Sequence, residues 1–343
     1  MKQFWGGLAV VVLSLLASCA PTEHLYPIFD KGHSGYADSQ GKIVIPAIYD
    51  TCGAFSEGLA PVVKGGKTGY IDQTGKLVIP AQFENGGRFS QGLAYVMKGG
   101  KVGFIDKTGQ VVIPFQWDYA RDFHHGLAVV VQGGKFGFIN LKGQVVVQPQ
   151  YDFAGQFSED LAMVDLKSKY GFIHPDGTVA IPLKYDSASS FEDGLALVGE
   201  GDKMFFIDKN QNRPFAPNFT NAEPFSDGLA LVWVGNKVGF IDTKGNPVIP
   251  PSFDYARSFS EGLAVVLENG KVGYIDKSGK LVIPAQFDNA SDFHQGLAYV
   301  ADGDMISYIN TKGEKVWSNS QAEAPSFEAP TGPDTPPTVS TQP

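Results

Sequence analysis

Short apolar runs separated by glycine-containing turns recur along almost the whole chain, with a period of 34 residues. In residues 263–296 the first run is Leu263–Leu267, and an Asn-Gly turn leads to a second run, Lys271–Asp276. A third run, Lys280–Ile283, follows another glycine turn, and we expect Pro284 to end it because proline has no N–H to donate. Each repeat is therefore predicted to be a three-stranded antiparallel sheet with a connection to the next.

The phrase Gly-Leu-Ala marks the same point of each repeat. It begins at Gly58, Gly92, Gly126, Gly194, Gly228, Gly262 and Gly296, and Asp160-Leu161-Ala162 fills the remaining place in register. A fixed period of this length is typical of one small unit stacked many times. Because one such sheet has a single good hydrophobic face, we expect neighbouring units to bury that face against each other.

The predicted fold class is all-β, with nine tandem 34-residue units over residues 25–317. The first and last units are complete in the same phase, whereas closed propellers often build one blade from both chain ends. We therefore expect the three-stranded antiparallel units to stack as an open solenoid or superhelix. A closed β-propeller-like ring is the alternative.

The two ends of the chain differ from the repeats. Lys2 precedes an apolar stretch too short to span a bilayer, and Leu16-Ala17-Ser18-Cys19 resembles the lipobox of bacterial lipoproteins. The resemblance implies a lipoprotein signal peptide (1–18), lipidation of Cys19 and a linker (19–24). It also implies a protein lipid-anchored in the bacterial cell envelope, at the outer membrane because Ala20 follows the cysteine. An ordinary secretory signal peptide is the alternative. Residues 318–343 are rich in Pro, Ser and Thr and are predicted to be a disordered tail.

The charge and cysteine content narrow the classes of partner. The net charge is -9, and removing residues 1–18 takes away one lysine, which leaves -10. A chain this acidic is a poor match for nucleic acid. Cys52 would be the one cysteine of the mature chain, and other repeats place Gly or Ala there. We interpret it as a small buried side chain.

The repeat pattern Lys-x-Gly-[Phe/Tyr]-Ile-Asp, then Val-Ile-Pro, then Gly-Leu-Ala resembles the WG-repeat family of bacterial proteins. It occurs in Lys67–Asp72, Lys101–Asp106 and Lys237–Asp242, and the resemblance covers residues 25–317. The family's tryptophan is replaced here by Thr68, Val102, Phe136, Tyr170, Met204, Val238 and Val272. The resemblance implies a β-repeat architecture and no defined reaction.

Candidate chemistry is sparse. One acid follows an aromatic residue in most repeats: Asp50, Glu84, Asp118, Asp152, Asp186, Asp254 and Asp288. We interpret these acids as caps of backbone donors in turns, the alternative being a stacked path for cations. His124 and His294 share a repeat position with serines, which indicates a structural role. No catalytic or metal-binding motif is present, so we expect neither an enzyme, a metal nor a cofactor.

Two sets of residues are candidates for a binding surface. The first lies on the variable face of the first strand of each repeat and includes Tyr95, Met97, Trp233 and Tyr299. If that face is open, it suits a partner, and the alternative is that both faces are buried. The second set, Tyr119 with Arg121 and Tyr255 with Arg257, could hold a sugar or peptide by stacking and bidentate hydrogen bonds. Solvated loops are the alternative there.

The sequence therefore predicts a non-catalytic, envelope-anchored repeat lipoprotein that acts as a binding or scaffolding surface for a protein or envelope polymer. The membrane is reached through the N-terminal lipid, and nucleic acid is not expected as a partner. A propeller-like hydrolase or lyase acting on glycans or peptides is the alternative, and a purely structural spacer is a third. Residues 160–220 depart most from the repeat, and they could form a specialised patch.

Overall fold

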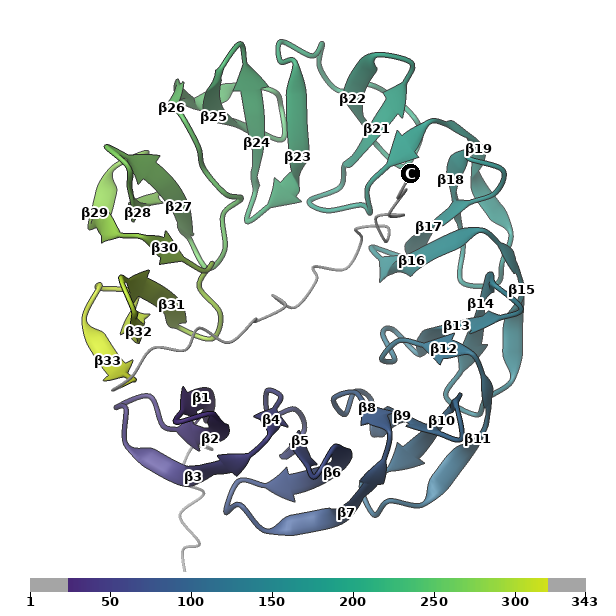
Figure 1. The fold of residues 1–343 in the computed structure, drawn as a ribbon. Helices are drawn as coiled ribbons and strands as arrows, with labels where there is room; N and C mark the ends of the chain where they lie inside the picture. Colours follow the sequence, from purple (N-terminus) through teal and green to yellow (C-terminus); the bar gives the residue numbers. More distant parts are fainter. Residues whose placement is uncertain (1–23, 320–343) are drawn as a thin grey trace, which may run out of the picture.

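The computed structural model describes residues 24–319, which form nine small antiparallel sheets arranged as a closed ring (Figure 1). Each repeat forms one sheet, and the sheets are numbered here as blades 1 to 9 in chain order. The architecture is thus a nine-bladed β-propeller. The expected open solenoid is wrong, and the ring named as its alternative is what forms.

Every blade contains a second and a third strand, joined by a tight hairpin. The second strands are β1 (Tyr26–Asp30), β5 (Leu59–Lys64), β9 (Leu93–Lys98), β13 (Leu127–Gln132), β17 (Leu161–Asp165), β21 (Ala196–Glu200), β24 (Leu229–Val234), β27 (Leu263–Glu268) and β31 (Leu297–Asp302). The third strands are β2 (His33–Ala37), β6 (Lys67–Asp72), β10 (Lys101–Asp106), β14 (Lys135–Asn140), β18 (Tyr170–Ile173), β22 (Lys203–Ile207), β25 (Lys237–Asp242), β28 (Lys271–Asp276) and β32 (Met305–Asn310).

Most blades add an innermost strand at the centre of the ring and an outer strand at its perimeter (Figure 1). The innermost strands are β4 (Thr51–Cys52), β8 (Asn85–Gly86), β12 (Tyr119–Ala120), β16 (Phe153–Ser158), β20 (Ser187–Ala188), β23 (Asn221–Ser226) and β30 (Asn289–Ala290). The outer strands are β3 (Ile43–Tyr49), β7 (Leu77–Phe83), β11 (Val111–Trp117), β15 (Val145–Tyr151), β19 (Val179–Tyr185), β26 (Pro247–Phe253), β29 (Leu281–Phe287) and β33 (Lys315–Ser318). The innermost strand was missed in the sequence, where it lies within the connection.

The prediction that Pro284 ends its strand is also wrong, because β29 continues to Phe287. The register explains how: Tyr274 pairs with Ile283 and Val272 pairs with Phe287, so three residues of β29 oppose the single Gly273. Pro284 lies in this bulge at the edge of the sheet, where a missing N–H breaks no ladder hydrogen bond.

The bulged outer strand passes directly over a glycine of the third strand. A Cβ built on Gly103 would lie 2.6 Å from the carbonyl oxygen of Ile113, closer than side chains approach backbone. Blade 6 has Phe205 at this position, and within the described residues it has no outer strand. Blade 9 has Ser307 there, and its outer strand is the shortest of the eight described. Glycine at this point is therefore the condition for a full outer strand.

The hydrophobic core lies between blades rather than within them. Eight clusters of buried side chains occur, and each joins two consecutive blades. Between blades 3 and 4, for example, Phe104 and Trp117 pack on Phe123 and Val130. An aromatic pair recurs at every one of these interfaces, with ring centroids 4.8 to 5.0 Å apart. The prediction that neighbouring units share their cores is confirmed.

Polar contacts repeat at the same interfaces. Ser56 Oγ donates to the carbonyl oxygen of Phe89 in the next blade at 2.6 Å, and Ser90 repeats the bond to Phe123. On the turn beside each serine, a carboxylate or amide accepts from a glycine N–H of the next blade, as Asp227 does from Gly262 at 2.7 Å. Each interface therefore combines apolar burial with hydrogen bonds of fixed register.

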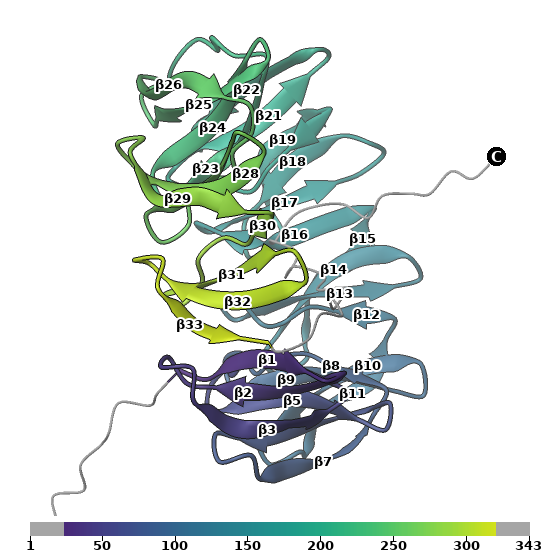
Figure 2. The same ribbon diagram turned by 60° about the vertical axis from the view of Figure 1, so that its left-hand side comes forward.

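Blade 9 meets blade 1 by a different set of contacts (Figures 1 and 2). Tyr308 donates its hydroxyl to the carbonyl oxygen of Pro27 at 2.8 Å, and its ring lies 6.4 Å from that of Tyr26. Tyr26 in turn donates to the carbonyl oxygen of Gln295. Among the described residues no hydrophobic cluster of the kind found at the other interfaces joins these two blades. The ring thus closes without sharing a blade between the chain ends.

The first strand of the ring, β1, begins at Tyr26. At the other end β33 includes Ser318, and Asn319 donates its N–H to Ile306, so the last blade extends two residues beyond 317. The proposed signal peptide, Cys19 and nearly all of the predicted tail lie outside the described residues.

The glycine beneath the outer strand gives a test of how each blade is built. We predict that Gly103→Ala lowers the free energy of unfolding by about 1–3 kcal/mol, because the added Cβ forces β11 away from β10. Chemical denaturation of the whole protein measures it. Val111→Ala on the same strand, where the side chain is 51% exposed, should cost no more than about 0.5 kcal/mol. Equal effects of the two substitutions would contradict this account of the outer strand.

Candidate functional site

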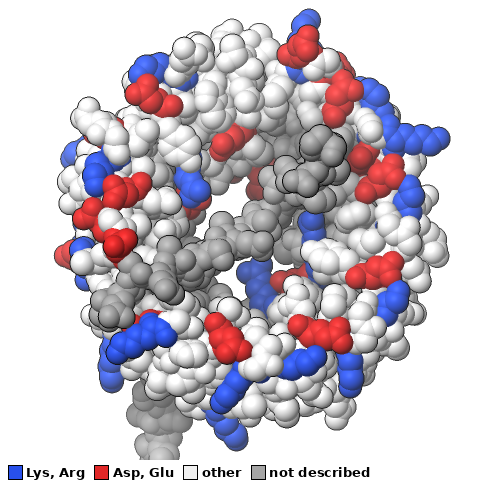
Figure 3. All heavy atoms as spheres, in the orientation of Figure 1, with Lys and Arg blue, Asp and Glu red and all other residues white. Residues whose placement is uncertain are grey.

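The ring surrounds a central opening, and charged side chains of both signs reach its wall (Figure 3). The innermost segment of each blade contains one small residue. The wall is formed by these segments and by the two residues that follow the small residue. This small residue is alanine in most blades, and the phenylalanine three residues later is constant among them. The two positions between them are Gly-Arg in blade 3, Arg-Asp in blade 4, Gly-Gln in blade 5, Ser-Ser in blade 6, Glu-Pro in blade 7, Arg-Ser in blade 8 and Ser-Asp in blade 9. The channel wall therefore differs in charge and polarity from repeat to repeat.

Two tyrosines stand out on this wall. Tyr119 is 46% exposed and Tyr255 is 45% exposed, although both lie at the inner edge of a sheet. Arg121 and Arg257 follow them two residues later, which places each arginine on the same side of the chain as its tyrosine. The candidate pairs chosen from the sequence are thus brought together at the channel, in blades 4 and 8.

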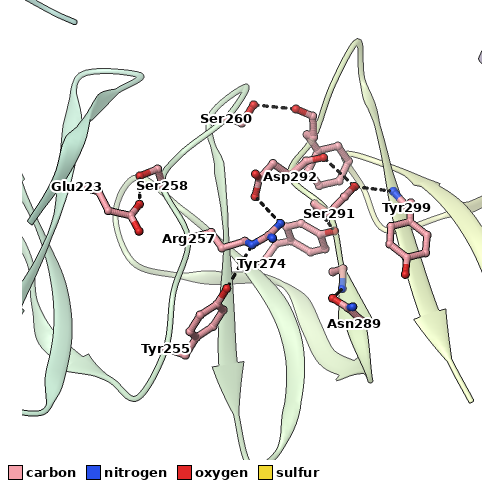
Figure 4. Close-up of polar contacts among 12 residues, drawn as sticks. Glu223, Tyr255, Arg257, Ser258, Ser260, Tyr274, Asn289, Ser291, Asp292 and Tyr299 are labelled. Atoms are coloured by element: carbon pink, nitrogen blue, oxygen red, sulfur yellow. Dashed lines mark hydrogen bonds and ion pairs between the residues drawn. The ribbon is translucent and has the colours of Figure 1, made fainter. Parts of the chain in front are cut away.

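Arg257 is engaged within the protein (Figure 4). Its Nε donates to the hydroxyl of Tyr255 at 3.3 Å, and its Nη1 lies 3.5 Å from Oδ1 of Asp292 in blade 9. Burial raises the pKa of Asp292, and the adjacent guanidinium opposes that rise. Ser291 donates to the carbonyl oxygen of its neighbour, Asp292, and accepts from the N–H of Tyr299. The result is a polar contact that closes blade 8 onto blade 9.

Arg88 and Asp122 make a second contact of this kind between blades 3 and 4. Arg88 Nε lies 3.1 Å from Asp122 Oδ2, and Oδ1 of the same carboxylate is buried without a hydrogen-bond partner among the described residues. Burial raises the pKa of Asp122, with Arg88 acting against the rise. Arg88, Asp122 and Asp292 were not chosen as site residues from the sequence. The signal that could have identified them is a charge at a position that other repeats fill with Ala, Gln or Ser.

The variable face of the second strands is an interface, not an open stripe. Tyr95 and Met97 are partly buried against the cluster between blades 3 and 4, and Trp233 packs in the same way between blades 7 and 8. Tyr299 is partly buried on the last blade. Of the two alternatives for this face, burial on both sides is the one the structure shows. Tyr119, Arg121, Tyr255 and Arg257 remain as the more accessible candidates.

Most of the acids that follow an aromatic residue accept hydrogen bonds from backbone N–H groups of a turn, as predicted. The turn is the hairpin between the second and third strands. Asp118 Oδ2 accepts from the N–H of Gly133 in the hairpin of its own blade, and Oδ1 binds Lys101 at 2.5 Å. The Lys101 amine and the backbone donor together hold the pKa of Asp118 below its ordinary value. The same backbone contact recurs at Asp50, Glu84, Asp152, Asp186 and Asp288. These carboxylates are therefore committed to the fold.

Histidine and cysteine also have structural surroundings. Nδ1 of His124 lies 3.0 Å from the carbonyl oxygen of Phe157, the bond that serines make at the other interfaces. Cys52 is partly buried, its Sγ lies 3.5 Å from the carbonyl oxygen of Gly35, and burial raises its thiol pKa to about 11. Residues 24–319 contain no group of three or more His, Cys, Asp or Glu side chains placed to hold a metal ion. Over the same range no helix has the length and apolarity to cross a membrane.

The segment that departs most from the repeat creates a small apolar cavity. In blade 6 the guanidinium of Arg213 lies over Phe205, 3.4 Å from the ring centroid, and residues 208–220 cover the blade without forming a strand. A cavity of about 200 Å³ lies between this segment and blade 7. Its lining includes Phe215, Phe219, Val234, Pro247 and Pro251. Phe205 packs in the cluster between blades 5 and 6, and the cavity lies where blade 6 has residues 208–220 in place of an outer strand.

Comparison with known families supports the repeat assignment. Eight segments match a family model described as WG containing repeat, at residues 35–67, 69–101, 103–136, 136–170, 170–203, 204–237, 239–271 and 273–304. The chain belongs to the WG-repeat family. The WG repeat therefore forms one propeller blade here, and the family assignment holds although the tryptophan of the repeat is absent from the seven positions named above.

Solved structures resemble this WG-repeat protein in fold. One, described as the crystal structure of the eukaryotic initiation factor, matches with a TM-score of 0.58 and 13% identity, over 86% of this chain and 96% of that one. Another, the dihydro-heme d1 dehydrogenase NirN in complex with DHE, gives a TM-score of 0.50 and 13% identity, over 88% and 74% of the two chains. No curated protein matches. At these identities the likeness shows the fold alone.

Proposed function

We propose that this WG-repeat protein is a non-catalytic binding or scaffolding protein of the bacterial cell envelope that holds a protein or envelope polymer at its central channel. One observation carries the proposal. The two wall positions of each blade differ from repeat to repeat in charge and polarity, whereas the aromatic pair that joins blades recurs at all eight shared cores. Recurring contacts are what the ring needs, and varied side chains are what a specific surface needs.

The channel wall also has the composition of a recognition surface. Tyr119 and Tyr255 expose almost half of their rings, and an arginine accompanies each of them. Tyrosine and arginine are enriched in binding interfaces, because each combines a flat apolar surface with a polar group that forms directed hydrogen bonds. Rigid sheets hold these side chains, so little ordering is required when a partner binds.

The alternative function is a hydrolase or lyase that acts on glycans or peptides. That alternative assumed a closed propeller, which is the architecture of this protein. A propeller supports binding proteins and enzymes alike, so the ring by itself favours neither. The channel residues described above form ion pairs and tyrosine contacts, and none of these contacts favours a cleavage reaction. The binding role is therefore the function we put forward.

The exposed tyrosines provide the test of the channel. We predict that the double variant Tyr119→Ala and Tyr255→Ala reduces capture of envelope partners at least tenfold in a pull-down with the mature protein, a loss of about 1.4 kcal/mol. The melting temperature should stay close to that of the wild type, since both rings are exposed. Ile48→Ala, which removes a 52% exposed side chain from the perimeter, is the control and should capture normally. Unchanged capture by the double variant would contradict a channel site.

Anchoring through Cys19 is part of the same proposal and is tested separately. Six residues lie between Cys19 and Tyr26, and the seven Cα–Cα steps span at most about 25 Å, so a lipid at Cys19 would keep the ring close to the membrane surface. We predict that Cys19→Ser moves the protein from the membrane fraction to the soluble fraction, while Cys52→Ser leaves it at the membrane. Membrane association of Cys19→Ser equal to that of the wild type would exclude the lipid anchor.

A further inference from the structure

Blades 4 and 8 carry the same short sequence at the channel, Tyr-Ala-Arg, but the arginines end in different surroundings. Residues 121 and 257 are four repeats apart, and their partners in the next blade can be compared directly. Arg257 faces Asp292 of blade 9, whereas the residue in the place of Asp292 next to Arg121 is Gln156 of blade 5. The two sites share the Tyr-Ala-Arg segment and differ in whether a carboxylate of the next blade faces the arginine.

In the site between blades 8 and 9, that carboxylate forms an ion pair with the guanidinium of Arg257. Asp292 Oδ1 lies 3.5 Å from Arg257 Nη1, and Tyr255 takes up the Nε hydrogen bond (Figure 4). A side chain of the protein itself thus shows the kind of group that a Tyr-Ala-Arg segment holds. Guanidinium groups favour carboxylates because their N–H groups form a planar fork that matches the two oxygens.

The site between blades 4 and 5 lacks this internal partner. Arg121 has no carboxylate within ion-pair distance among the described residues, and its guanidinium lies 5.7 Å from the ring centroid of Phe153. Gln156 is turned away, since its Nε2 donates to the carbonyl oxygen of Asp122 at 3.1 Å. Gly155, which is buried, stands where blade 9 has Ser291. A partly buried cation beside an exposed tyrosine is left without an anion.

The backbone of this site is held in place by the sheet. Tyr119 pairs with Val131, and the N–H of Arg121 donates to the carbonyl oxygen of Val129 at 3.0 Å. Ala120 between them is fully buried against blade 3. Tyr119 and Arg121 therefore project together on the side of blade 5, in a fixed geometry that a ligand does not have to create.

We propose that Tyr119 and Arg121 bind a carboxylate-bearing sugar unit of an acidic polysaccharide. The carboxylate takes the place at Arg121 that Asp292 has at Arg257, and the apolar face of the sugar ring stacks on Tyr119. An extended peptide is a poorer match at Tyr119, because β12, the strand that carries it, is two residues long and offers little free edge for strand addition. The inference rests on the proposed binding function and specifies its ligand class.

The overall charge of the protein makes this site testable. A net charge of -9 repels polyanions at long range, so capture of an acidic polymer at physiological salt depends on local arginines. The probes are polygalacturonate, uncharged dextran and polyglutamate, whose binding to the whole mature protein is measured by titration calorimetry. We expect binding of polygalacturonate, with dextran and polyglutamate at least tenfold weaker.

Two exchanges between the matched sites provide the decisive variants. Gln156→Asp should give Arg121 an internal partner and weaken polygalacturonate binding at least tenfold, without removing the arginine. Asp292→Gln should free Arg257 and add a second binding site, seen as a doubled stoichiometry. Arg121→Lys should retain part of the affinity, because it keeps the charge and loses the planar fork. Circular dichroism and melting temperature confirm that each variant is folded.

Several results would overturn the inference. These are absence of polygalacturonate binding, unchanged affinity of Gln156→Asp, or tighter binding of polyglutamate than of polygalacturonate. If polygalacturonate does not bind while the variant lacking Tyr119 and Tyr255 still loses its envelope partner, the ligand class is wrong and the channel function stands. If neither probe nor partner responds to these residues, both proposals fail.

Discussion

The whole structure depends on one constraint: a three- or four-stranded blade cannot bury its own apolar side chains, and the next blade must do so. All eight hydrophobic clusters join two consecutive blades, and an aromatic pair lies at the centre of each interface. Such a pair contributes about 0.5–1.5 kcal/mol beyond its buried area. Stability is therefore a sum over interfaces, and the interface between blades 9 and 1 rests on tyrosine contacts instead.

This constraint explains where the chain is free to vary. The aromatic pairs that join blades recur because the interfaces share one geometry, whereas the two wall positions of each blade lie outside these pairs and can differ. Phe205 shows the cost of varying the wrong position: it replaces the glycine beneath the outer strand, and blade 6 has no outer strand among the described residues. Variation of the two wall positions leaves the strands of the blade intact. It gives one Tyr-Ala-Arg segment whose arginine is paired with Asp292, and one whose arginine, Arg121, has no carboxylate partner among the described residues.

Much of the fold could be predicted from the sequence, because the 34-residue period and the Asn-Gly and Gly turns act locally. The nine units, the strand pairs and the shared cores follow from that pattern. Closure could not be predicted, since it depends on the small angle between successive blades, which no single residue encodes. The strand that runs through Pro284 was missed because the bulge over Gly273 depends on tertiary contact. At the site, Tyr119 and Arg121 could be selected by their repeat position, while the pairing of Arg88 with Asp122 and of Arg257 with Asp292 becomes evident only when blades are adjacent.

The most direct test of the central claim is the behaviour of one blade in isolation. A peptide of residues 85–118, which contains all of blade 3, lacks the side chains of blades 2 and 4 that complete its two interfaces. Circular dichroism of this peptide during heating should show an unfolded chain with no cooperative transition. A stable β spectrum with a cooperative melt would contradict the account, because the blade would then carry its own core.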